Sequence, residues 1–420
     1  MELLTRAPRG TADVLPGDSY KWQYAERIMA EVAAACGYRE MRMPVFEHTE
    51  LFQRSVGETT DVVQKEMYTF LDKGGRSVTL RPEGTAGAAR AFLEHALHNE
   101  TLPVKAYYLT SCYRYEKPQA GRLREFHQFG IECFGAAAPQ ADAEVIALAN
   151  AVIGRLEIAG VTLRINSIGC PDCRAAYHAA LRGFLDPRRD SFCETCRGRL
   201  ERNPMRVLDC KIPSCGQLTA GAPRMMAHLC DGCRAHFDAV CGYLEAAGIA
   251  YSIDPGIVRG LDYYTRTVFE FVSDLPIAQP VVVGGGRYDG LMQELGGPLV
   301  PSLGFGMGIE RILLAMEASG AKFPDPPAPE LYLAAMGEDA LRACFAMAVT
   351  LREKGLRVEC DTAGRGLKAQ MKYADKIGAR YVMVVGGDEL AAGKAKLKEM
   401  ASGEEREVVL DGGIIRELRN

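Results

Sequence analysis

The most constraining feature of this 420-residue chain is a set of eight cysteines that form four close pairs between Cys170 and Cys233. The pairs are Cys170/Cys173, Cys193/Cys196, Cys210/Cys215 and Cys230/Cys233. Each spacing lets two thiolates reach one tetrahedral ion, so the set predicts one structural Zn²⁺ site or two. In an intracellular chain such clustering favours metal binding over a disulfide framework. Reduced buried cysteines are the alternative, and spacing alone does not show which pairs share an ion.

Composition is that of an ordinary globular protein. The chain is 48% hydrophobic and 25% charged, which excludes a disordered protein. Its net charge of −4 excludes a uniformly basic nucleic-acid binder, so any such contact must come from local patches. No apolar run approaches the ~18–20 residues of a membrane span, and residues 1–10 lack a signal-peptide core. We therefore expect a cytoplasmic protein with roughly three domains and no membrane partner.

Breaks in composition and periodicity predict the domain bounds. We expect the first part of a core over residues 1–165, an insertion with the cysteine cluster over 166–250, the second part of the core over 251–322, a linker over 323–329 and a last domain over 330–420. The linker is stiff because four prolines stand between Phe323 and Glu330. After the linker, strand-like runs alternate with helical periods in a βαβαβ order, which is typical of a small α/β domain.

The core is predicted to be an antiparallel sheet flanked by helices, an α+β fold. Helical periods cover Tyr20–Cys36, Ala141–Leu156 and Phe237–Ala247, and a strand–turn–helix passage covers Gly304–Ala318. Strand-like runs are Tyr38–Met43, Ser77–Leu80, Lys105–Tyr113, Phe126–Phe134, Tyr264–Val272 and Val281–Val283. Hairpin-like loops, rather than regular helical crossovers, join the first of these runs, and such loops indicate antiparallel pairing.

Two neighbouring strands of the predicted sheet carry arginine, glutamate and glutamine. Arg114 and Glu116 share one face, as do Gln128 and Glu132 in the next strand. A planar guanidinium can hold a phosphate through two parallel bonds, and a nearby carboxylate can fix its rotamer. An ion-pair network on a solvated face is the alternative explanation. Because the chain lacks a P-loop and a complete dinucleotide loop, any nucleotide must be bound by a site of another kind.

These strands and a later segment resemble motifs of the class II aminoacyl-tRNA synthetases. Arg114–Glu116, the loop after it and the strand that bears Phe126 are similar to motif 2, which holds ATP. Gly304–Ile312 is similar to motif 3, whose arginine lies over the nucleotide phosphates. The helix Tyr20–Cys36, the strand after it and Pro44 resemble motif 1, an element of the dimer interface.

Further segments resemble one family of this class, the histidyl-tRNA synthetases. Arg259–Phe271 and Gly284–Leu291 are similar to the two blocks peculiar to that family. Arg9–Asp13, Gly57–Val63 and Thr79–Thr85 also resemble it, and the likeness runs from about residue 6 into the C-terminal domain.

The resemblance implies ATP-dependent ligation of L-histidine to its cognate tRNA through a histidyl-adenylate, with release of pyrophosphate and AMP. It also implies Mg²⁺ with ATP, a homodimer and an anticodon-binding domain over residues 330–420. The alternative is a non-catalytic paralogue, a histidine-sensing regulatory subunit of ATP phosphoribosyltransferase. That relative typically lacks the C-terminal domain and part of the set Arg114, Arg259 and Arg311, so the sequence favours the enzyme.

Site residues follow from the resemblance position by position. Histidine would be bound by Glu83, Thr85, Gln128, Glu132, Arg259, Tyr263, Tyr264 and Tyr288. ATP would be bound by Arg114, Glu116, Arg122, Phe126 and Arg311, and the catalytic residues would be Arg259 and Arg114, on either side of the α-phosphate. The chemistry agrees, because selection of an imidazole needs an acceptor and a second polar partner. For Tyr263 and Tyr264, half-buried strand aromatics are the alternative.

We predict that Arg259→Ala abolishes adenylate formation, because the reaction needs positive charge where negative charge builds up on the α-phosphate. Arginines in phosphoryl transfer are typically worth ~10³ or more in rate. Histidine-dependent ATP–pyrophosphate exchange measures the step, and the circular dichroism spectrum checks that the fold is intact. A folded variant that exchanges at close to the wild-type rate would contradict the assignment.

Overall fold

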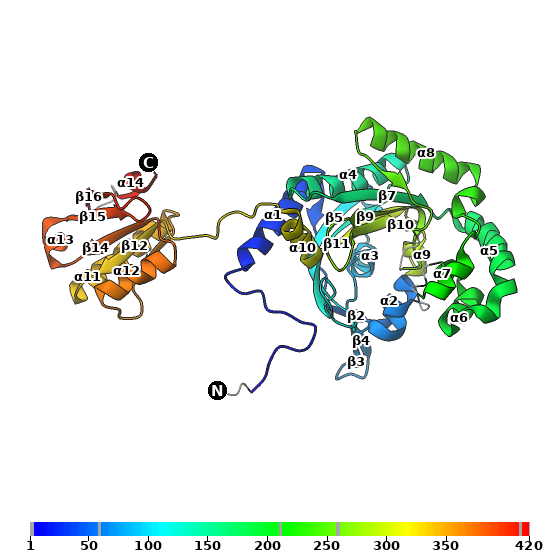
Figure 1. Cartoon of the computed structure of the whole chain (residues 1–420), viewed down its shortest axis with the longest axis horizontal. Coiled ribbons are helices and arrows are strands. Elements are labelled where there is room, and N and C mark those ends of the chain that lie inside the picture. The colour runs from blue at the N-terminus through cyan, green and yellow to red at the C-terminus, as the bar shows by residue number, and fades with distance from the viewer. Residues whose placement is uncertain are drawn as a thin grey trace. The chain divides into compact units, whose positions relative to one another are not determined.

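The computed structural model describes residues 4–57, 60–208, 210, 212–257, 261–410 and 414–419. It contains two compact units, with the division between Pro324 and Asp325, inside the proline-rich segment (Figure 1). No described helix is both long enough and apolar enough to cross a membrane.

The first unit is built on an eight-stranded sheet with the order β1-β5-β6-β11-β10-β9-β7-β8. The strands are β1 (Arg39–Glu40), β5 (Val104–Tyr113), β6 (Glu125–Phe134), β7 (Val161–Ser167), β8 (Ser252–Ile253), β9 (Thr265–Ser273), β10 (Val281–Arg287) and β11 (Ser302–Gly308). Every neighbouring pair from β5 through β6, β11, β10 and β9 to β7 is antiparallel. The two edge pairs, β1–β5 and β7–β8, are parallel. The antiparallel sheet predicted from the sequence is confirmed.

Helices cover both faces of this sheet. On one face lie α1 (Ser19–Ala35), α4 (Pro139–Arg155), α8 (Asp231–Ala246) and α10 (Ile309–Ser319). They bury side chains such as Ile28, Val145 and Phe237 with Ile131 of β6, and each large apolar side chain buried in this way contributes about 1.5–3 kcal/mol. On the other face, α3 (Thr85–Glu94) packs through Phe92. The polar residues of the candidate site lie on this second face.

Shorter elements complete the first unit. They are α2 (Thr49–Val56), α9 (Leu291–Glu294), the one-turn helices η1 (Val62–Glu66) and η2 (Leu97–Asn99), and a small sheet with the order β2-β4-β3, formed by β2 (Phe46–His48), β3 (Thr69–Leu71) and β4 (Ser77–Leu80). The predicted strand Tyr38–Met43 is reduced to β1. The Met41 N–H still donates to the Tyr107 carbonyl of β5 at 2.8 Å, whereas the Met43 and Pro44 carbonyls accept hydrogen bonds from the Arg81 guanidinium and not from a strand.

The cysteine-rich insertion lies between β7 and β8 and is helical. It consists of α5 (Pro171–Leu185), α6 (Glu194–Arg202), α7 (Pro213–Thr219), α8 and the short turns η3 (Asp186–Ser191), η4 (Pro204–Val207) and η5 (Met225–His228). Leu181, Leu185 and Leu200 belong to the same buried cluster as Phe92 and Tyr263. The insertion therefore shares its apolar core with the sheet on which it sits.

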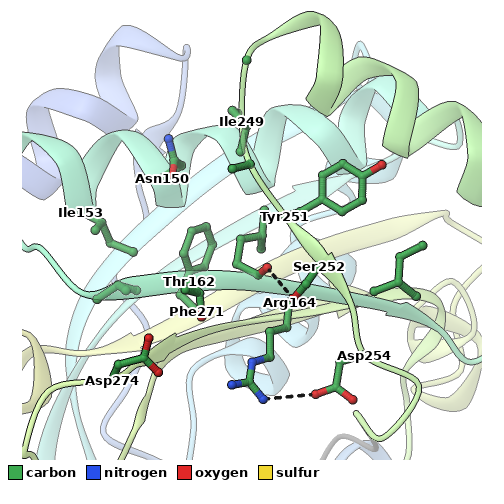
Figure 2. A pocket seen from close by; sticks show the side chains of 15 residues that line it. Asn150, Ile153, Thr162, Arg164, Ile249, Tyr251, Ser252, Asp254, Phe271 and Asp274 are labelled. Atoms are coloured by element: carbon green, nitrogen blue, oxygen red, sulfur yellow. Dashed lines mark hydrogen bonds and ion pairs between the residues drawn. The ribbon is translucent and has the colours of Figure 1, made fainter.

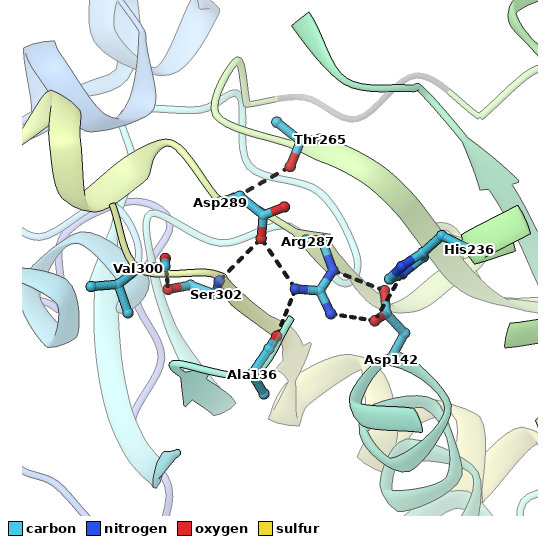
Figure 3. A network of polar contacts seen from close by, with 8 residues as sticks. All are labelled: Ala136, Asp142, His236, Thr265, Arg287, Asp289, Val300 and Ser302. Atoms are coloured by element: carbon cyan, nitrogen blue, oxygen red, sulfur yellow. Dashed lines mark hydrogen bonds and ion pairs between the residues drawn. The ribbon is translucent and has the colours of Figure 1, made fainter. Parts of the chain in front are cut away.

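A buried charged network ties the insertion to the sheet (Figure 3). Arg287, which is fully buried, donates from Nε to Asp142 Oδ1 at 3.2 Å and from Nη1 to Asp289 Oδ1 at 3.1 Å. His236 of α8 completes it, with Nε2 at 3.2 Å from Asp142 Oδ2. Burial by itself raises the pKa of Asp142, but His236 and Arg287 hold it below its usual value. The network fixes the end of β10, immediately before Tyr288.

The second unit is a five-stranded sheet with the order β13-β12-β14-β15-β16. Its elements are β12 (Leu331–Ala335), α11 (Glu338–Glu353), β13 (Val358–Cys360), α12 (Leu367–Lys376), β14 (Tyr381–Val385), α13 (Gly387–Ala392), β15 (Lys394–Glu399), β16 (Glu405–Val409) and α14 (Ile414–Arg419). The parallel β13-β12-β14 core matches the predicted βαβαβ order. Sequence patterning misses β15, because Lys394–Glu399 has no β-branched or aromatic residue.

Candidate active site

Glycines in β11 make room for two long polar side chains of β6. Gln128 and Glu132 lie on one face of β6, as alternation predicts, opposite Gly308 and Gly304. A Cβ atom at Gly304 would lie 2.5 Å from a carboxylate oxygen of Glu132, and one at Gly306 would collide with the side-chain amide of Gln128. The glycines of β11 therefore leave space for a cluster of polar side chains centred on Glu132, which we call the candidate pocket.

Glu132 lies at the centre of this pocket and is fully buried. Its Oε1 accepts hydrogen bonds from Thr85 Oγ1 at 2.7 Å and from the Tyr108 hydroxyl at 3.1 Å, and its Oε2 accepts one from the Tyr288 hydroxyl. Burial raises the pKa of Glu132 to about 8, although these hydroxyls lower it. The site thus holds a carboxyl group away from water, surrounded by neutral donors.

Tyr108 belongs to this pocket but was not predicted. It faces Gly130 across the β5–β6 pair, and a Cβ atom at Gly130 or at Gly84 would collide with its ring. The signal in the sequence is a tyrosine opposite a glycine, and it can be recognised only when the register of the hairpin is known.

Glu83 is held at the start of α3. Its two carboxylate oxygens accept hydrogen bonds from the backbone N–H groups of Thr85 at 2.7 Å and Ala86 at 2.8 Å. The helix N-terminus favours negative charge, while burial raises the pKa of Glu83. Because Thr85 also donates to Glu132, one threonine connects both acidic groups.

Three tyrosines form an aromatic wall beside these carboxyl groups. The ring of Tyr263 lies 4.7 Å from that of Tyr264 and 5.4 Å from that of Tyr288, between ring centroids. All three are buried, and burial raises the pKa of Tyr263 and of Tyr288 well above the usual value. The hydroxyl groups of Tyr263 and Tyr288 therefore stay protonated in the physiological pH range.

The predicted ATP residues lie in and beside the β5–β6 hairpin. Arg114 donates from Nε to the Pro82 carbonyl at 2.8 Å, and its guanidinium carbon lies 5.3 Å from the centroid of the Phe126 ring. Arg122 Nε lies 2.7 Å from Glu116 Oε2. Arg114 Nη1 lies 3.9 Å from Glu116 Oε1, and the two side chains are only 22% and 14% exposed. The pair therefore differs from the alternative explanation, an ion-pair network on a solvated face, and Glu116 is shared with a loop arginine.

Arg311 brings a third guanidinium to this region. It donates from Nε to the Gly121 carbonyl at 2.9 Å and from Nη1 to the Val281 carbonyl at 3.0 Å. Burial and the nearby charges of Arg122 and Arg114 lower the pKa of Arg311. These three arginines create a positive region that an anionic ligand would stabilise. The fourth predicted arginine, Arg259, lies outside the described residues.

A link between the segments that resemble motifs 2 and 3 was not predicted. Both carboxylate oxygens of Glu310 accept from the backbone N–H of His127, at 2.9 and 3.0 Å, and the His127 ring lies 2.9 Å away through Nδ1. The bond to Glu310 raises the pKa of His127. The other side of the His127 ring packs edge to face against the ring of Trp22, with 5.0 Å between the ring centroids. No spacing in the sequence indicates this contact.

The eight clustered cysteines separate into two groups of four. Cluster I is Cys170, Cys173, Cys230 and Cys233, and cluster II is Cys193, Cys196, Cys210 and Cys215. Within each cluster the sulfur atoms lie within 4.8 Å of one another. Four sulfurs around a tetrahedral Zn²⁺ are about 3.8 Å apart, so each donor set fits one zinc ion. This arrangement answers the pairing question that spacing leaves open.

A cavity of about 670 Å³ lies elsewhere, at the β7–β8 edge of the sheet (Figure 2). Its lining includes Ile153, Phe271 and the pair Arg164–Asp254, whose Nη1 and Oδ2 atoms are 3.3 Å apart. None of the predicted site residues that the structure describes lines it. We therefore place the candidate site at Glu132 and not in this cavity.

Comparison with known proteins places this geometry in context. The family model described as "Histidyl-tRNA synthetase" matches residues 10–172 and 220–312, and that described as "Anticodon binding domain" matches 330–414. The histidine–tRNA ligase of Caldanaerobacter subterraneus is 55% identical and covers 97% of this chain and 98% of its own length; that of Acetivibrio thermocellus is 54% identical and covers 99% of each. The crystal structure of the S. aureus histidyl-tRNA synthetase without ligands has a TM-score of 0.86 at 38% identity, covering 99% of this chain and 100% of its own.

The raised pKa of Glu132 predicts a pH-dependent stability. A carboxyl group with a raised pKa in the folded protein stabilises the fold most below its unfolded pKa of about 4.3, and this contribution is lost as the pH rises through about 8. We expect wild-type protein to lose thermal stability relative to Glu132→Gln, whose amide does not titrate, between about pH 6 and about pH 9. A constant difference in melting temperature across this range would show that Glu132 is ionised throughout.

Proposed function

The chain belongs to the histidyl-tRNA synthetase family, and we propose that the buried Glu132 selects the imidazole of histidine in the reaction of this family. That reaction is the ATP-dependent ligation of L-histidine to its cognate tRNA through a histidyl-adenylate, with release of pyrophosphate and AMP. The regulatory alternative is not favoured, because relatives of 54% and 55% identity over nearly the whole chain are named histidine–tRNA ligases.

The observation that carries the proposal is the carboxyl group of Glu132, buried among three hydroxyls. An imidazole ring has two nitrogens, one a donor and one an acceptor in the neutral form. Glu132 accepts from the ring N–H, and Gln128 or a tyrosine hydroxyl supplies the second polar contact. An amino acid without matching nitrogens leaves buried polar groups unpaired, which such a site rejects strongly. Tyr263, Tyr264 and Tyr288 pack around the ring.

The amino group of the substrate binds at Glu83 and Thr85. Each Glu83 oxygen already accepts one backbone N–H group, and a carboxylate has about four acceptor positions. The helix therefore fixes the carboxylate while leaving acceptor capacity for an ammonium group. Thr85 joins this subsite to Glu132. The distance between the group that binds the substrate ammonium and the group that binds its imidazole is therefore fixed by the protein.

Adenylate formation needs positioning and positive charge more than proton transfer. The substrate carboxylate is already ionised near neutral pH, so it attacks the α-phosphorus without a general base. Arg114 and Arg259 stabilise the charge that develops on the α-phosphate, and Arg122 and Arg311 receive the rest of the triphosphate. Phe126 packs on the adenine and Glu116 holds the guanidinium of Arg122. Mg²⁺ bound with ATP would supply further positive charge for the departing pyrophosphate.

The second substrate and the partner subunit use other surfaces. Residues 330–414, which match an anticodon-binding domain, bind the anticodon of the cognate tRNA in the cytoplasm. A second copy of the chain covers the small sheet β2-β4-β3, where Phe46, Phe70 and Leu71 are 56%, 49% and 70% exposed. Large apolar side chains at this exposure indicate an interaction surface, and the motif 1 helix supports a homodimer.

The two cysteine clusters each hold one structural Zn²⁺. The fit of four sulfurs to one tetrahedral ion supports this proposal, as does the meeting in cluster I of two segments that are 57 residues apart in the chain. A bound ion joins α5 to α8 in cluster I and α6 to α7 in cluster II, and its binding free energy contributes directly to folding. No step of the ligation passes through it.

The proposed function predicts that histidine-dependent ATP–pyrophosphate exchange occurs and that Glu132→Ala raises the KM for histidine by about 100-fold or more, with little change in the KM for ATP. The reason is that the side chain touches only the amino acid. Glu94→Ala, the same substitution at the exposed end of α3 and outside the pocket, is the matched control. Absence of exchange in wild-type protein would contradict the function, and equal losses for both substrates would contradict the role of Glu132.

For the metal sites we expect about two zinc equivalents per chain by elemental analysis of protein purified without added metal, one for each set of four thiolates. The double variant Cys193→Ser, Cys210→Ser loses one equivalent, and Cys36→Ser, outside both clusters, loses none. Zero zinc together with eight thiols that titrate freely would overturn the proposal.

A further inference from the structure

The insertion contacts the segment that bears Tyr263 and Tyr264, here called the histidine-binding block (residues 261–271). The contact is made by the segment between Cys196 and Cys210 of cluster II. Arg206 in η4 is 8% exposed and donates from Nε and Nη2 to Asp262 Oδ1, both at 3.3 Å. Asn203 donates from Nδ2 to the same oxygen at 3.3 Å. Asp262 directly precedes Tyr263, so the insertion holds the chain at the edge of the pocket.

Asp262 is confined on its other side by the end of α2. Its backbone N–H donates to the Val56 carbonyl at 3.3 Å. Gly57 has φ of +98°, and a Cβ atom there would lie 2.6 Å from Asp262 Oδ2. The carboxylate therefore occupies a slot between a glycine turn and the insertion, and it has little freedom to move while Arg206 is in place.

The same block is held from cluster I. Arg174, next to Cys173, donates from Nη1 to the Tyr264 carbonyl at 3.2 Å. Arg266 has φ of +50°, a strained value for a residue with a side chain. Its backbone is held by a 2.9 Å bond from its N–H to the Gly169 carbonyl and a 2.8 Å bond from the Ile168 N–H to its own carbonyl. The surroundings therefore fix residues 262 to 266 from both ends.

We infer that Arg206 is a positioning residue for histidine recognition, which acts through Asp262 on Tyr263. The ring of Tyr263 contacts that of Tyr288, whose hydroxyl donates to Glu132. A displacement of Asp262 would therefore move Tyr263 and, through Tyr288, change the surroundings of Glu132. The inference rests on the proposed histidine pocket. It gives the insertion a role in substrate affinity that the metal sites alone do not require.

A purely structural role for Arg206 makes a different prediction. If the ion pair only docks the insertion, its loss lowers stability and the amount of active enzyme, and both KM values stay the same. A positioning role changes the KM for histidine selectively, because a pocket that is no longer pre-organised must be ordered when the amino acid binds. The KM for ATP is expected to stay nearly unchanged, because Arg114, Arg122 and Arg311 lie on other elements. A change in kcat alone does not count for the inference, because the proposed catalytic residue Arg259 is close to Asp262 in the chain.

The test is ATP–pyrophosphate exchange with the full-length enzyme carrying Arg206→Ala, Arg206→Lys or Asp262→Asn. We expect Arg206→Ala and Asp262→Asn to raise the KM for histidine by about tenfold, and the KM for ATP to change by less than about twofold, since small displacements at a binding site reduce binding strongly. Arg206→Lys keeps the charge and restores most of the loss. Arg189→Ala is the matched control, because Arg189 pairs with Glu201 inside the insertion, and it leaves both KM values unchanged.

Zinc content is measured on the same preparations. If Arg206→Ala loses zinc, the KM for histidine of Asp262→Asn decides the question, because that substitution alters no cysteine-bearing segment. A KM for histidine equal to that of wild type in the variant that keeps its zinc overturns the inference, as does an equal rise in both KM values. Failure of the proposed function is recognised separately, because wild-type protein then shows no histidine-dependent exchange.

Discussion

The buried carboxyl group of Glu132 is the constraint on which the rest of the site depends. A carboxyl group without water must be surrounded by donors, and here Thr85, Tyr108 and Tyr288 supply them from three separate elements. The start of α3, strand β5 and the chain after β10 meet at this one carboxyl group only when the sheet is complete. The same contacts that satisfy Glu132 therefore define a pocket suited to a small ring with two nitrogens.

Charged contacts outside the pocket hold its walls in place. The network of Arg287, Asp142 and His236 fixes the chain next to Tyr288 (Figure 3), and Arg206 with Asp262 fixes the chain next to Tyr263. Buried ion pairs are weak sources of stability but leave a costly unpaired charge when broken. In this protein both networks end beside a pocket tyrosine and both reach into the insertion. On the proposed role of Arg206, the insertion supports substrate recognition through its contact with Asp262.

Sequence reasoning predicted the parts of the site that follow from local pattern. Alternation along one strand placed Gln128 and Glu132 on one face, and the proline-rich segment marked the division between the two units. Tyr108 was missed because its contact with Glu132 depends on hairpin register. The grouping of Cys170 with Cys230 also could not be predicted, since it depends on how α5 and α8 approach each other. The role of Arg259 stays a prediction, and the roles of the other site residues are proposals that the geometry supports.

The central claim is that Glu132 reads the ring nitrogens of histidine, and binding of N-methylated histidines tests it most directly. Isothermal titration calorimetry compares L-histidine with its two ring-methylated isomers, which have similar size and charge. The account predicts that methylation of the nitrogen facing Glu132 weakens binding at least about 100-fold, because the methylated nitrogen can no longer donate to the buried carboxyl group, and that Glu132→Ala loses this discrimination. Equal affinity of wild-type enzyme for histidine and both isomers would contradict it.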